Sequence, residues 1–176
     1  MTDKLGTYKS LENALDLAAT VAACARADLR DTGDLQERIE ESLHDLVHMF
    51  CYQGRKAIEQ SNHGKNIGTI SNIYPHSKPT NALLISDDTT NLVPLSNESF
   101  WWIINRIVHS LDFTVLRVEN IQQDLGSVFC KHLDVGGSRV ISFRSDRDPD
   151  DILHYVDLDA LVTSFVQDVA PLLLLK

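Results

Sequence analysis

The chain has only three cysteines among its 176 residues. No two of them form a Cys-x-x-Cys pair, and an odd number of widely spaced cysteines argues against a disulfide framework or a structural zinc knuckle. The first residues lack the apolar core of a signal peptide, and no stretch approaches the roughly 20 apolar residues of a membrane span. We therefore expect a cytoplasmic protein that does not contact a membrane.

Basic side chains are scarce as well. Sixteen Lys and Arg residues stand against twenty-five Asp and Glu residues, which gives a formal charge of -9. A surface of this sign repels nucleic-acid phosphates and anionic lipids, so direct binding of nucleic acid is disfavoured. Hydrophobic residues make up 43% of the chain, which is ordinary usage for a folded domain. A chain of this length can bury a core without a disulfide or a metal.

Apolar spacing predicts an α+β fold that begins with a helical hairpin. Residues 10–29 and 34–60 both repeat apolar side chains at helical spacing, and Asp31-Thr32-Gly33 separates them. The second half predicts a mostly antiparallel sheet of about five strands with two further helices. We expect one compact domain, built from the hairpin (1–61), a polar loop without acidic residues (62–80) and a sheet-and-helix portion (81–176).

Local signals place the individual elements. In the second helix we expect Leu35 and Phe50 on the apolar face, and Gly54 marks a kink or an early end. In the third helix Ser96 is the expected cap, and the expected buried face runs from Phe100 to Leu111. The remaining expected elements are strands at 82–86, 92–95, 113–118, 128–135 and 139–143, a hairpin turn at Gly136-Gly137, and a last helix from Asp157 that Pro171 ends.

The second helix carries a candidate metal site. On a helix over 34–60, Glu37, Glu41, His44 and His48 fall on one line. Two carboxylates and two imidazoles in a row can ligate a divalent metal, so a metal-dependent hydrolase is one alternative function. The segment His44-Asp45-Leu46-Val47-His48 also resembles the zinc-protease pattern H-E-x-x-H, with aspartate in place of the general base.

The position of this metal stripe on the helix argues for a solvated face. The stripe lies opposite the apolar residues Leu35, Ile39, Leu46 and Phe50, and a line opposite the buried face is normally exposed. We therefore expect a metal or contact site only where another element or a second subunit covers that face.

Two acidic or nucleophilic groups elsewhere have incomplete patterns. The first is a cysteine, a histidine and an aspartate at alternate positions of one expected strand. Side chains two residues apart on a strand are about 6.6 Å apart, which is too far for a hydrogen bond between a nucleophile and its base. This first group consists of Cys130, His132 and Asp134. The second matches a calcium-binding loop that lacks its glycine, and a solvated acidic turn that caps the last helix is the favoured interpretation of the same residues. It consists of Asp146, Asp148, Asp150 and Asp157.

Aromatic and aliphatic residues supply candidate anchors for a partner. These anchors are Trp101 and Trp102 in the third helix and Leu172, Leu173, Leu174 and Leu175 at the end of the chain. We therefore expect a non-catalytic protein that binds another protein, as an inhibitor, immunity-type protein, adaptor or chaperone does, with a homodimer as a further option. No cofactor is expected apart from the divalent metal of the alternative above. A second alternative is an acidic mimic of nucleic acid that blocks a basic groove.

Overall fold

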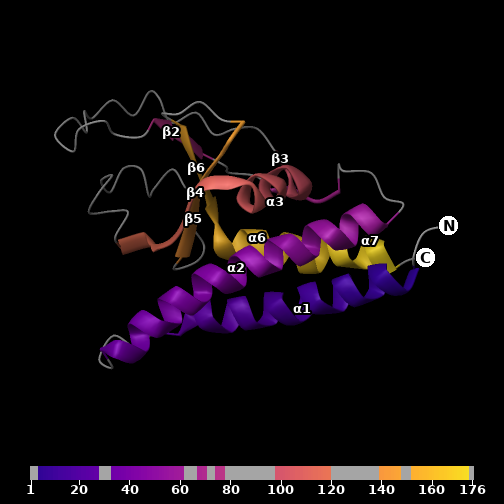
Figure 1. Ribbon diagram of the computed structural model, residues 1–176, viewed down its shortest axis with the longest axis horizontal. Helices are drawn as coiled ribbons and strands as arrows, with labels where there is room; N and C mark the ends of the chain where they lie inside the picture. Colours follow the sequence, from indigo (N-terminus) through magenta and orange to yellow (C-terminus); the bar gives the residue numbers. More distant parts are fainter. Residues whose placement is uncertain are drawn as a thin grey trace.

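The computed structural model describes residues 4–27, 33–61, 67–70, 74–77, 98–119, 139–147 and 152–174. Within these ranges two long helices, a four-stranded antiparallel sheet, a two-stranded pair and shorter helices form an α+β fold. In Figure 1 the long helices α1 and α2 and the C-terminal helix lie together on one side of the sheet. The expected α+β class and the N-terminal helical hairpin are confirmed.

The hairpin consists of α1 (Lys4–Arg26) and α2 (Asp34–Gln60). On α1 the buried hydrophobic residues are mostly small, which lets α2 approach closely; they are Leu11, Ala14, Ala18, Val21 and Ala25. The Ser10 hydroxyl donates to Oε1 of Gln60 at 3.0 Å, so the start of α1 lies beside the end of α2. The N-terminal turns of α2 consequently project past the end of α1 (Figure 1). Neither long helix, nor any other helix in the described ranges, is apolar enough over sufficient length to span a membrane.

The buried side of α2 is rotated from the one that the sequence predicts. Its buried residues are Leu43, Val47, Phe50, Cys51, Gly54, Ala57 and Ile58. Leu35, expected in the core, is 49% exposed because it lies on the projecting turns, where α1 no longer covers α2. The helix does not end early at Gly54. A Cβ there would lie 3.5 Å from Phe165 and 3.6 Å from Phe100, which is ordinary van der Waals contact, so both rings pack against the helix at this position without requiring glycine.

The main sheet has the order β2-β6-β5-β4, and all neighbouring strands are antiparallel. Its strands are β2 (Tyr74–Ser77), β6 (Ile152–Asp157), β5 (Arg139–Ser145) and β4 (Ser110–Arg117). Phe113 of β4 faces Phe143 of β5, which faces His154 of β6. A separate pair joins β1 (Thr69–Ile70) to β3 (Glu98–Ser99).

Two of the expected strands correspond to β4 and β5, whereas a sheet of five strands is not confirmed. The short strands β2 and β6 were not expected, because a four-residue and a six-residue run beside acidic or proline-containing turns carries little periodicity. The expected strands at 82–86, 92–95 and 128–135, the turn at Gly136-Gly137, and the group Cys130, His132 and Asp134 lie outside the described residues.

Helix α3 (Phe100–Val108) packs the expected apolar residues against the core. Phe100, Ile103, Ile104 and Ile107 are all buried. The cap is Ser99 rather than Ser96, because the Ser99 hydroxyl directly precedes the helix and accepts the N–H of Trp102 at 3.2 Å. Leu111, expected on the buried face, is 61% exposed because the helix ends at Val108 and the chain turns into β4.

The C-terminal helix is continuous from α6 (Leu158–Ser164) through a π-helical turn η3 (Phe165–Val169) to α7 (Ala170–Leu174). Asp157 caps it, since Oδ1 accepts the N–H groups of Asp159 and Ala160. The prediction that Pro171 ends this helix is wrong. The N–H of Ala170 bonds to Phe165 O, five residues back, and this wider turn accommodates the proline ring.

Gly68 packs closely between α3 and the π-helical turn. Its φ is +68°, and a Cβ built there would lie 2.6 Å from Cγ2 of Val169 and 3.0 Å from Cβ of Phe100. Gly68→Ala is therefore expected to lower the free energy of unfolding by about 2–4 kcal/mol, the sum of overpacking and backbone strain. Urea denaturation measures this loss.

Gly33→Ala is the matched control for that variant. Gly33 also has a positive φ, +51°, but nothing lies within 4 Å of a Cβ placed there. The loss at this position should be only the backbone strain, about 1–3 kcal/mol, since its ψ of -112° lies outside the left-handed helical region. Equal losses for the two variants would show that the contact with Val169 is not the cause.

Candidate functional site

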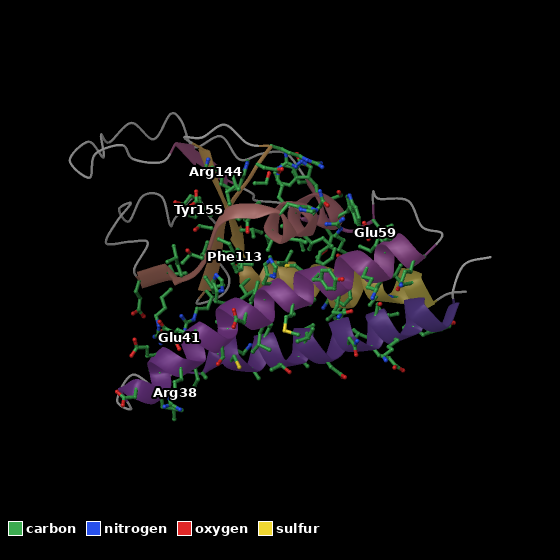
Figure 2. All side chains as sticks on the ribbon, in the orientation of Figure 1. Arg38, Glu41, Glu59, Phe113, Arg144 and Tyr155 are labelled. Atoms are coloured by element: carbon green, nitrogen blue, oxygen red, sulfur yellow. The ribbon has the colours of Figure 1, made fainter. Side chains whose placement is uncertain are left out.

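The four residues of the metal stripe occupy unequal surroundings on α2. Glu37 and Glu41 are exposed on the projecting turns, whereas His44 and His48 are half-buried. Strand β4 covers the histidines: the ring centroid of Phe113 lies 4.5 Å from that of His44 and 6.0 Å from that of His48. Figure 2 shows Phe113 between the sheet and α2. The histidine half of the stripe is therefore not a fully solvated face, because β4 crosses that side of the helix.

Both ring nitrogens of His44 face oxygen atoms of the protein. Nε2 lies 3.2 Å from the carbonyl oxygen of Phe113, and Nδ1 lies 3.5 Å from Oδ1 of Asp45. A carbonyl only accepts, so Nε2 carries the proton and has no lone pair for a metal in this arrangement. Since β4 is the outermost of the described strands on this side of the sheet, this bond also satisfies a carbonyl group at that edge.

No three His, Cys, Asp or Glu side chains among the described residues are grouped so that they hold one metal ion. The ligation of a metal by Glu37, Glu41, His44 and His48 therefore stays a prediction from the sequence. Metal analysis of protein purified without a histidine tag tests it directly. Of the calcium-loop candidates, Asp157 serves as a helix cap and Asp146 lies in an exposed turn, while Asp148 and Asp150 are outside the described residues.

Glu40, which the sequence analysis did not single out, is the centre of a charged cluster between α2 and the sheet. Its Oε1 accepts three hydrogen bonds: from Nε of Arg117 at 2.7 Å, from Nη1 of Arg139 at 3.3 Å and from Nε2 of Gln36 at 2.8 Å. The Arg139 side chain is only 3% exposed. This cluster ties the projecting turns of α2 to the end of β4 and the start of β5.

The electrostatics of the cluster favour ionised Glu40. Partial burial alone would raise the pKa of the Glu40 carboxyl, but the hydrogen bonds from Arg117 and Gln36 and the positive charges of Arg139 and Arg117 outweigh it and lower the pKa. The sequence pattern of α2 indicates that Glu40 is an unusually placed charge. Glu40 lies three residues before buried Leu43 and seven before buried Val47, so it is a charge on the core-facing side of an amphipathic helix.

The two tryptophans expected to bind a partner are half-buried, and each has an arginine over its ring. Arg55 lies 5.8 Å from the ring centroid of Trp101 and also hydrogen-bonds Glu59 and His109. Arg106 lies 3.8 Å from the ring centroid of Trp102. The ring of Trp102 also meets that of His154 edge-on at 5.3 Å. Cation–π contacts within the chain thus occupy part of both rings.

The leucines at the end of the chain divide between core and surface. Leu173 is buried, whereas Leu172 is 37% and Leu174 53% exposed; Leu175 lies outside the described residues. Helix α7 places Leu173 on the side that faces the core, so its two neighbours point elsewhere. Val166 adds a third exposed aliphatic side chain on the same continuous helix.

A further set of exposed apolar side chains lies on α2 and β4, and the sequence analysis did not identify it. Met49 and Tyr52 are about half-exposed on α2, and Leu111 is the most exposed large hydrophobic residue of the described chain. The sequence pattern that indicates the exposure of Met49 and Tyr52 is their position on the polar side of an amphipathic helix.

Comparison with known proteins does not place the chain in a group: no family model, no curated protein and no solved structure matches it. Functional inference therefore rests on the contacts described above.

Replacing Glu40 tests the charged cluster. Glu40→Gln removes the charge that faces Arg117 and Arg139, and we expect the free energy of unfolding at pH 7 to fall by about 1–2 kcal/mol, a charged hydrogen-bond value reduced for the partial exposure of Glu40. Because the folded-state pKa of Glu40 is lowered, this contribution is complete above the unfolded-state value near 4.5 and disappears as the pH falls through the folded-state pKa.

Glu41→Gln is the control, since it removes the same charge from an adjacent, exposed position. Its effect should stay within about 0.5 kcal/mol. Chemical denaturation of both variants between neutral and acidic pH gives the comparison. A difference between Glu40→Gln and the unmodified protein that persists unchanged at acidic pH would contradict the assignment.

Proposed function

We propose that this protein acts without catalysis, by binding another protein through apolar side chains of its C-terminal helix. The observation that carries the proposal is the exposure of Val166, Leu172 and Leu174 on one continuous helix while Leu173 anchors that helix in the core. Leu172 and Leu174 lie on opposite sides of Leu173, so these aliphatic groups suit recognition by an apolar groove that surrounds the exposed half of the helix.

Three reactive side chains of the described residues, Cys51, Glu40 and Asp157, are buried or engaged in structural contacts, which agrees with a binding role. Burial raises the pKa of the Cys51 thiol far above its ordinary value, so the nucleophilic thiolate is disfavoured. Glu40 is held by two arginines, and Asp157 accepts backbone hydrogen bonds at the start of α6. Each of these groups therefore has a role in maintaining the fold.

The chemistry of the C-terminal helix defines the kind of partner. From Leu158 to Leu174 only Asp159 and Asp168 carry a charge, although the whole chain has a net charge of -9. An interface through this helix gains most of its free energy from apolar burial, which salt weakens little. An acidic mimic of nucleic acid would instead lose affinity steeply as salt rises. Salt dependence thus separates the proposed function from this alternative.

Paired baits test the proposal. We expect Leu172→Ser combined with Leu174→Ser to reduce capture of a specific partner from native lysate at least about tenfold, because two hydroxyls replace two apolar anchors. Binding to the unmodified bait should persist between about 0.05 and 0.5 M salt. Quantitative mass spectrometry of the captured proteins measures both effects, and thermal unfolding by circular dichroism confirms that the variant is folded.

Leu35→Ser is the matched control bait. Leu35 is exposed to a similar degree but lies on the projecting turns of α2, far along the molecule from α7 (Figure 1). It should capture the partner as well as the unmodified bait does. Identical captured proteins on all three baits would refute a role for the C-terminal helix, and capture that vanishes at high salt would favour the acidic mimic.

A further inference from the structure

The outward side of α2 carries a short row of side chains with opposite charges at its two ends. Asp45, Met49, Tyr52 and Lys56 follow one another at spacings of four, three and four residues, so they lie in one row along the helix. All four are exposed, with Met49 at 52% and Tyr52 at 49%. We call these four residues the α2 row.

The α2 row is complementary to itself when it is reversed. It reads acid, apolar, apolar, base, and a two-fold axis midway between Met49 and Tyr52 would exchange its ends. A second α2 helix laid antiparallel across that axis sets Met49 against Tyr52 and Asp45 against Lys56, and each pair occurs twice. This is the pattern of an isologous interface, in which residue i contacts j and j contacts i.

We propose that the partner for this surface is a second copy of this chain, docked through the α2 row of each copy. Charge complementarity selects the antiparallel arrangement. A parallel pairing would set Asp45 against Asp45 and Lys56 against Lys56, and like charges that face one another oppose association. The antiparallel pairing replaces both repulsions with attractions and brings the apolar centres together.

Strand β4 extends the apolar centre of the row. His109 contacts Arg55, and Phe113 contacts His48, so the intervening part of β4 runs alongside α2 from Arg55 to His48. Leu111 lies in that part of the strand and is 61% exposed. It adds exposed aliphatic surface on the strand that borders this part of α2.

Charged residues near the α2 row are paired within the chain, so Asp45 and Lys56 are the charges that face a docking partner. Arg55 is paired with Glu59 on the same helix, and Asp112 of β4 is paired with Arg144 of β5. Asp45 has an 85% exposed side chain, and among the described residues its contact is a long one, 3.5 Å, with His44. The next pair across the two-fold axis, Ser42 with Glu59, contains no like charges.

This dimer surface does not depend on the proposed function, since the C-terminal helix with Leu172 and Leu174 is a separate element. The two proposals therefore fail independently. If the protein is monomeric in solution, its capture of a different protein can still be measured. If it captures no other protein, its mass in solution can still be measured.

A charge-swap experiment tests the arrangement. Sedimentation equilibrium of the full chain at about 0.15 M ionic strength should show a concentration-dependent dimer. Asp45→Lys sets two lysines face to face at both ends of the row, and Lys56→Glu does the same with acids. Each single variant is expected to raise the dimer dissociation constant at least about tenfold, whereas the double variant should return it to within about threefold of the unmodified protein.

The control is Asp16→Lys, which makes the same change of net charge as Asp45→Lys but on the exposed side of α1. It should leave the dimer dissociation constant within about threefold of that of the unmodified protein. Thermal unfolding verifies that each variant is folded; if one single variant does not fold, the other carries the same test. A protein that stays monomeric at all concentrations overturns the proposal. So does a dimer that tolerates both single reversals, or one that the double variant fails to restore.

Discussion

The packing of three phenylalanine rings around Gly54 is the contact on which the rest of the molecule depends. Phe50 comes from α2, Phe100 from the start of α3, and Phe165 from the π-helical turn, and their ring centroids lie 5.2 to 6.2 Å apart. Two of these rings, Phe100 and Phe165, pack against α2 at Gly54. The contact joins three elements that are distant in sequence, and it sets the rotation of α2 about its axis.

That rotation decides what each remaining side of α2 can do. With Phe50 turned inward, His44 and Arg55 face β4 and the residue that follows α3, where they bond Phe113 and His109. Glu40 then lies within reach of two arginines of the sheet. The side of α2 opposite the three rings is exposed to solvent, and it carries apolar side chains as well as acidic and basic ones. A single helix thus supports the core, holds the sheet edge and presents a surface.

The sequence predicts the parts of this arrangement that depend on local periodicity. The hairpin, the apolar face of α3 as far as Ile107 and the start of the last helix at Asp157 all follow from spacing and capping, and the structure confirms them. Apart from the local errors at Ser96 and Pro171, the errors arise where distant elements meet. The exposure of Leu35 depends on where α1 ends, and the cover over His44 depends on the path of β4, which no pattern within α2 encodes. The charged partners of Glu40 were missed for the same reason.

The π-helical turn links the length of the C-terminal segment to the presence of Pro171. A π-helical turn holds one residue more than an α-helical turn, so removing one residue between 165 and 169 would restore a regular α-helix and leave Leu173 directed at the core. The same deletion would bring the ring of Pro171 against the carbonyl group four residues before it. Sequence drift should therefore lose or retain the proline and the extra residue together.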